Sequence, residues 1–131
     1  MNWKRVAAFA AILFASEVFV GFIEAGVSGI DATAFKQRLL LGAALSLGFA
    51  ITIFAAMSYR QAHRPLLHAA SAFLLERAFS FTLGVVLPEW LGGTPFVLLV
   101  LGWLTLAVGL LAGTILGRQL ATVRGRAGAD A

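Results

Sequence analysis

Long apolar stretches alternate along the chain with short segments that contain polar residues, glycine or proline. A helix that crosses a hydrocarbon core of about 30 Å needs about 20 mostly apolar residues. Residues 6–28, 39–59, 65–87 and 95–117 meet this requirement. Because the connections are short, sequential helices are expected to be antiparallel neighbours. The pattern therefore predicts one all-α domain over residues 1–131, an integral membrane four-helix bundle with up-down-up-down topology and short loops.

The segments between the apolar stretches contain signals for helix starts. Pro65 and Pro95 suit the first position of a helix, where a backbone N–H is not needed, and Thr94 suits the preceding cap position. After the last stretch, residues 118–131 are mostly small and polar. We expect this segment to be a flexible tail.

Composition supports a membrane protein and excludes several other classes. Of the 131 residues, 60% are hydrophobic and 12% are charged. Soluble domains are roughly half apolar and a quarter charged, and disordered chains are poorer still in apolar residues, so both classes are excluded. The sequence contains no Cys. This absence excludes disulfides, thiolate metal sites and cysteine nucleophiles.

The positive charges fall mainly on one side of the predicted bundle. A net charge of +4 in a soluble protein would suggest a nucleic-acid partner, but in a membrane protein it is explained by topology. Lys36 and Arg38 fall on the opposite side. Since Lys and Arg concentrate in cytoplasmic loops, both termini are predicted to be cytoplasmic. The excess of Arg over Lys, eight to two, fits a GC-rich bacterial genome, so we expect the membrane to be a bacterial inner membrane. The residues predicted on the cytoplasmic side are Lys4, Arg5, Arg60, Arg64, Arg118, Arg124 and Arg126.

The N-terminal stretch has a second interpretation. Lys4 and Arg5, with the apolar run that follows them, resemble the first two regions of a signal peptide. Leu13 and Phe14 make a poor cleavage site, and the apolar run continues through Ile23. We therefore expect the first stretch to be retained as a spanning helix.

Four charged residues lie inside the predicted spans. A charged residue at the centre of a membrane helix costs roughly 2.5–3.5 kcal/mol, so such residues usually face the bundle interior or water and have partners. Glu17 and Glu76 are the midpoints of the first and third stretches, and are expected at about the same depth. Glu24 follows Glu17 by seven residues, on the same helix face and about 10 Å nearer the far surface. Arg77 follows Glu76 directly, and its long side chain can reach around the helix.

We expect Arg77 to bridge Glu17, Glu76 or both, and so to hold the first and third helices together. Three carboxylates then share one guanidinium. Because burial disfavours the charged form of a carboxyl group, at least one of the three is expected to be protonated near neutral pH. The cluster can be structural, or it can await a charge on a partner protein. Alternatively, Glu17 and Glu24 can form two steps of a path for protons or ions, although no Asn, Gln or Tyr lines the rest of it.

Small residues recur at every fourth position in two of the predicted helices. This spacing lets a second helix approach closely, backbone to backbone. The contact can be internal to the bundle, or it can join the fourth helix to a second copy or to a larger membrane complex. The residues predicted to pack in this way are Gly102, Gly109, Gly113 and Gly117 in the fourth stretch and Gly42 and Ser46 in the second.

A basic cluster surrounds the loop between the second and third stretches. His63 and His68 are five residues apart, which is not the spacing of a helical metal pair, and no acidic ligand is near them. We therefore predict neither a metal site nor a cofactor. The positive charge instead indicates contact with anionic lipid headgroups of the bilayer. The residues predicted to make it are Arg60, His63, Arg64 and His68.

Two functions remain, since the chain contains no nucleophile-elbow, zinc-peptidase or phosphate-loop motif and is not expected to be an enzyme. The first is a non-enzymatic accessory, assembly or interaction subunit, whose charge cluster holds the first and third helices. The alternative is a minimal proton-coupled transporter with a membrane-embedded Glu as the proton carrier. In its short four-span layout and in Glu17, the chain is similar to the small multidrug-resistance antiporters. The similarity stops there, because this chain is longer, has more charges in its third helix and lacks that family's tryptophan- and glycine-bearing motif.

Overall fold

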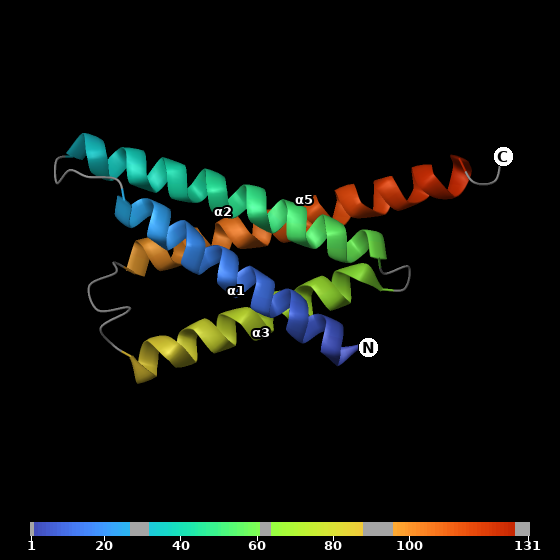
Figure 1. The fold of residues 1–131 in the computed structure, drawn as a ribbon, viewed down its shortest axis with the longest axis horizontal. Coiled ribbons are helices and arrows are strands. Elements are labelled where there is room, and N and C mark those ends of the chain that lie inside the picture. The colour runs from blue at the N-terminus through green and yellow to red at the C-terminus, as the bar shows by residue number, and fades with distance from the viewer. Residues whose placement is uncertain (1, 27–31, 61–63, 88–95, 128–131) are drawn as a thin grey trace.

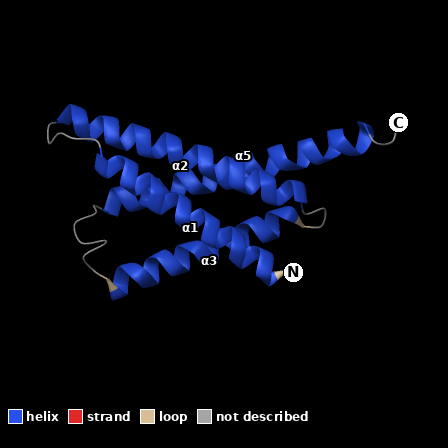
Figure 2. Ribbon diagram, viewed as in Figure 1, coloured by secondary structure: helices blue, strands red, loops and turns tan. Residues whose placement is uncertain are grey.

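The structure is a computed structural model that describes residues 2–26, 32–60, 64–87 and 96–127. Within these ranges the regular secondary structure is α-helical throughout (Figure 2). The helices are α1 (Trp3–Gly26), α2 (Ala32–Arg60), α3 (Pro65–Val86) and α5 (Phe96–Ala127).

Each of the four helices is long enough and apolar enough to cross a membrane. The shortest, α3, has 22 residues, which at about 1.5 Å per residue exceeds a hydrocarbon core of about 30 Å. The prediction of four membrane-spanning-capable helices is therefore confirmed. As predicted, α3 begins at Pro65, whereas Thr94 and Pro95 lie outside the described residues.

Two helices are longer than the apolar stretches that indicated them. α2 begins at Ala32 rather than near residue 39. α5 continues to Ala127, so most of the segment predicted to be a flexible tail is helical. The reason is that hydropathy reports where a helix meets hydrocarbon, whereas Arg, Gln, Leu and Ala beyond that boundary are all good helix formers.

Successive helices double back along the long axis of the molecule, and the start of α1 and the end of α5 lie toward the same end of it (Figure 1). The most extensive contact is between α2 and α5, and the helices approach each other most closely in the second half of α2 (Figure 1). α1 packs against both α2 and α3, while α3 makes only small contacts with α2 and α5. Glu17 on α1 is thus placed where it can meet groups from α3 on one side and from α2 on the other.

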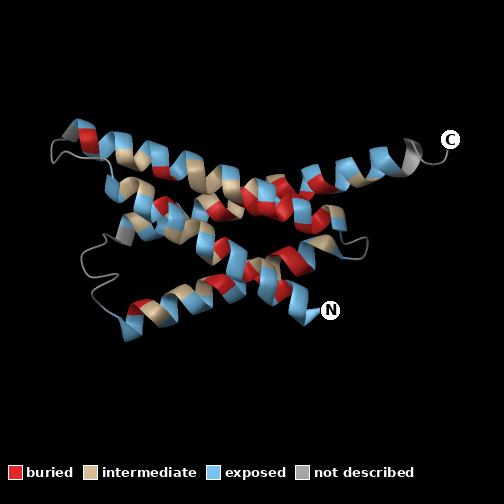
Figure 3. Ribbon diagram, viewed as in Figure 1, coloured by how far each residue is buried: buried red, intermediate tan, exposed pale blue. Residues whose placement is uncertain are grey.

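Buried residues concentrate where the helices cross, and the outer faces are apolar and exposed (Figure 3). The core contains Leu13 of α1, Phe54 and Met57 of α2, and Leu106 of α5, none more than 2% exposed. Elsewhere large apolar side chains face outward along every helix. Such a surface is unfavourable in water and is typical of a bundle surrounded by lipid.

The glycines of α5 form the close contact with α2. A Cβ atom built on Gly109 would lie 2.5 Å from the Cβ of Ala50. One on Gly113 would lie 2.6 Å from the carbonyl oxygen of Ile51. Gly117 is equally close to α2, near Ala55 and Ser58. The glycine face of α5 is therefore occupied by α2 of the same chain, with no room for larger side chains.

Gly102 and Gly42, which the same spacing assigned to helix packing, have other surroundings. No described atom lies within 4 Å of the position of a Cβ on Gly102. Gly42 is buried under the carboxylate of Glu24 rather than under a helix backbone. Among these glycines, the close contact between helix backbones is thus made by Gly109, Gly113 and Gly117 of α5, and not by Gly102 or Gly42.

Candidate functional site

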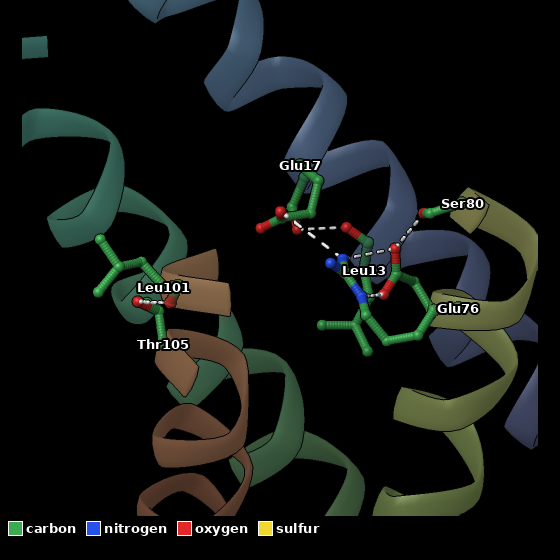
Figure 4. Close-up of polar contacts among 8 residues, drawn as sticks. Leu13, Glu17, Glu76, Ser80, Leu101 and Thr105 are labelled. Carbon is green, nitrogen blue, oxygen red and sulfur yellow. Dashed lines mark hydrogen bonds and ion pairs between the residues drawn. The ribbon is translucent and has the colours of Figure 1, made fainter. Parts of the chain in front are cut away.

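Of the four charged residues of the predicted spans, three lie near the middle of their helices, and Glu24 lies in the last turn of α1. Glu76 and Arg77 belong to α3, and Glu17 and Glu24 to the facing helix α1. In Figure 4 a dashed line joins Glu17 of α1 to the guanidinium that is also bonded to Glu76 of α3. These side chains form two different environments, one around Glu76 and one around Glu17.

Glu76 is the more fully bonded of the two carboxylates. It is 1% exposed, and its Oε2 accepts a hydrogen bond from Nε of Arg77. Its Oε1 accepts one from an Nη atom of Arg77 at 2.8 Å and one from the hydroxyl of Ser80 at 2.6 Å. Arg77 and Glu76 therefore form a bidentate, charge-assisted pair within a single helix, which is the strongest form of such a contact.

Glu17 is held much less tightly by the same guanidinium. Its Oε2 lies 3.7 Å from an Nη atom of Arg77, which is beyond ordinary hydrogen-bonding distance. The side chain of Glu17 is 27% exposed, compared with 12% for Arg77. Arg77 thus meets both carboxylates, as the sequence allowed, but unequally.

On its other side Glu17 borders a polar cavity between α1, α2 and α5. Ser46 of α2 lines this cavity together with Glu17. The cavity has a volume of about 490 Å³, which is in the range of small-molecule sites. Its chemically relevant lining residues are Glu17, Glu24, Arg38, Ser46, Gly102 and Thr105.

The carboxylate of Glu24 occupies space that is free only because Gly42 has no side chain. A Cβ on Gly42 would overlap the Glu24 carboxylate and lie 2.6 Å from its Cδ. Glu24 lies seven residues after Glu17 on α1, and both line the same cavity. Two carboxylates and one guanidinium, that of Arg38, line this cavity. A bound proton or cation can supply the positive charge that would balance the second carboxylate.

Arg38 is a member of the cavity that the sequence did not indicate. Its side chain lines the same space as Glu17 and Glu24. The signal was available, because Arg38, Gly42 and Ser46 are spaced by four and so share one face of α2. It was missed because the apolar stretch begins at residue 39, and Arg38 was taken to lie outside the span.

The predicted lipid-contact residues lie in three different situations. Arg60 and Arg64 are exposed at the ends of α2 and α3. His68 is 8% exposed, and its Nδ1 is 3.0 Å from the carbonyl oxygen of Arg64. It is therefore turned into the bundle and is not a headgroup contact, because α3 begins at Pro65 and places position 68 on the inner face. His63 lies outside the described residues.

Among the residues that the structure describes, no three His, Cys, Asp or Glu side chains lie close enough together to hold a metal ion. Comparisons with protein-family models, with curated proteins and with solved structures give no match for this chain. The function must therefore be argued from the site itself.

Proposed function

We propose that this chain is a multi-pass protein of the bacterial cytoplasmic membrane that carries protons, alone or in exchange for a small cation, by means of Glu17 and Glu24. In this proposal residues 1–131 form one four-span domain whose helices alternate in direction across the bilayer. Both termini are cytoplasmic, because Lys and Arg gather at that end of the bundle. No catalytic step is part of the proposal.

One observation carries the proposal: Glu76 already occupies Arg77 with two hydrogen bonds. Had Arg77 needed Glu17 for neutralisation, Glu17 would be a structural countercharge. Glu17 instead lies beside a cavity that also contains Glu24. An intramembrane carboxylate beside such a cavity, without a tight partner, is typical of proton and ion pathways.

Proton flux into proteoliposomes tests this function. The purified protein is reconstituted around a pH-sensitive dye, and a pH gradient is imposed with and without external tetraphenylphosphonium as a cation probe. The wild type is expected to dissipate the gradient faster than protein-free vesicles. The rate for Glu17→Gln is expected to equal that of protein-free vesicles, because the amide of Gln neither gains nor loses a proton near neutral pH.

Glu89→Gln provides a matched control, since it removes a carboxylate outside the predicted spans. Its flux is expected to equal that of the wild type. A wild-type rate equal to that of protein-free vesicles, both with and without the cation, would contradict the proposal.

An accessory or assembly role is the second candidate. The hydrogen-bonded group of Glu76, Arg77 and Ser80 supports it, because a satisfied buried polar network can specify how helices associate without any change of protonation. In that case, removing Glu17 changes stability or the size of the complex extracted in mild detergent, and leaves proton flux at the level of protein-free vesicles throughout.

A further inference from the structure

A second cavity lies at the end of the bundle opposite Glu24, where α2 ends and α3 begins. Its volume is about 760 Å³, and α2, α3 and α5 all contribute to its wall. The residues that matter for its chemistry are Ser58, Arg64, Leu66, Leu67, Ala70 and Arg118. None of the residues that line it is Asp or Glu.

The rim of this cavity is suited to an anion. Arg64, which directly precedes α3, and Arg118 of α5 both line this cavity. The N-terminus of α3 lies there too, and the side chain of Arg64 makes no capping hydrogen bond to it. The first-turn N–H groups of Leu66 and Leu67 have no acceptor within the helix, so they can donate to a bound anion.

An independent observation is the state of Ser58 in the cavity wall. Ser58 is 2% exposed, and its hydroxyl has no hydrogen-bond partner among the described residues. A buried hydroxyl without a partner is unfavourable, and buried polar groups are normally bonded. Ser58 is among the residues that line the cavity, so a ligand with an oxygen acceptor could provide the missing partner once the hydroxyl turns toward it.

The rest of the wall is apolar. Leu66 and Leu67 are about half exposed, at 51% and 49%, and Ala70 continues the same wall one turn further along α3. A free inorganic anion would use the guanidinium groups and leave this apolar surface uncovered. A phospholipid has a phosphate for the rim and an acyl chain for the wall.

We propose that this cavity binds one anionic phospholipid, with its phosphate between Arg64 and Arg118 at the start of α3 and an acyl chain along Leu67 and Ala70. The site differs from the headgroup contact that the sequence predicted. It retains Arg64, adds Arg118 and Ser58, and excludes His68, which is bonded to the backbone of Arg64. It is independent of the proton path, from which it is separated along the bundle.

Lipid titration of the full-length protein in detergent tests the site. Native mass spectrometry gives the number of lipids retained, and thermal stability as a function of lipid concentration gives the apparent affinity. Dioleoylphosphatidylglycerol is expected to bind with one retained molecule and to stabilise the protein. Dioleoylphosphatidylcholine, with the same acyl chains, and inorganic phosphate are expected to do neither.

Arg64→Gln and Arg118→Gln are each expected to weaken binding of phosphatidylglycerol roughly fivefold, since one surface arginine contributes about that much to binding an anionic lipid. Ser58→Ala is expected to weaken it as well. Arg5→Gln, which removes an equal charge from an exposed position at the start of α1, is the matched control and is expected to bind normally. Equal binding of phosphatidylcholine, equal stabilisation by inorganic phosphate, or an equal loss in Arg5→Gln would each overturn the proposal.

Discussion

Glu17 and Glu76 are identical groups near the middle of two helices that pack together, and they share the same arginine. Glu76 accepts two hydrogen bonds from Arg77 and a third from Ser80. Glu17 stands 3.7 Å from Arg77 and borders a cavity that it shares with Glu24. The difference shows that two carboxylates that look equivalent in the sequence have different numbers of hydrogen-bond donors around them in the fold.

The small residues spaced along α2 also fall into two groups, one in contact with another helix and one beside carboxylates. Ala50 and the residues after it are in tight contact with the glycines of α5, whereas Gly42 and Ser46 lie beside the carboxylates of α1. The first group fixes the helices, and the second makes room for polar groups. The tight contact between the two helices contributes no residue to the lining of the cavity.

The largest effect is expected from Glu76→Gln. It removes the negative charge that neutralises Arg77. The Arg77 side chain, which is only 12% exposed, is then left with little compensating negative charge. Breaking such a pair typically costs about 3–5 kcal/mol of unfolding free energy. SDS-induced unfolding in mixed micelles measures the change, and Glu17→Gln measured in parallel is expected to lose much less.

Gly113→Leu is expected to have the next largest effect. A side chain at this position meets the backbone of Ile51 and the Cβ of Phe54, so α2 and α5 must separate at a cost of about 1–3 kcal/mol. Thermal unfolding in detergent measures the loss. Gly48→Leu is the control, because a Cβ there meets no described atom within 4 Å, and an equal loss in that variant would show that the α2–α5 contact is not the cause.

The overall fold was more predictable from the sequence than the site. Apolar length alone predicts four spanning helices, and Pro65 indicates the start of α3. Hydropathy cannot show that α2 and α5 extend beyond the hydrocarbon, because their terminal turns are polar but still helix-forming. The unequal sharing of Arg77 also could not be predicted, since neighbouring residues on a helix point about 100° apart and only side-chain conformation brings Arg77 back to Glu76. The burial of His68 has a similar cause, as it depends on which face of α3 turns inward.

A small effect on stability, but a large one on flux, is expected from Gly42→Ala. The added methyl displaces the Glu24 carboxylate, which lies at the end of a flexible side chain and can rotate away. The higher helix propensity of Ala offsets this by up to about 1 kcal/mol, so unfolding free energy should change by less than that amount. Proton flux in proteoliposomes is expected to fall, whereas Gly48→Ala is expected to leave flux unchanged.

The most direct test of the division between the two carboxylates is a pair of double-mutant cycles on unfolding free energy, Glu17→Gln with Arg77→Gln and Glu76→Gln with Arg77→Gln. Contacting charged residues give coupling energies of about 0.5–3 kcal/mol. We predict a Glu76–Arg77 coupling near the top of that range and a Glu17–Arg77 coupling near the bottom. A Glu17–Arg77 coupling equal to or greater than that of Glu76–Arg77 would make Glu17 a structural countercharge and contradict its assignment to the cavity.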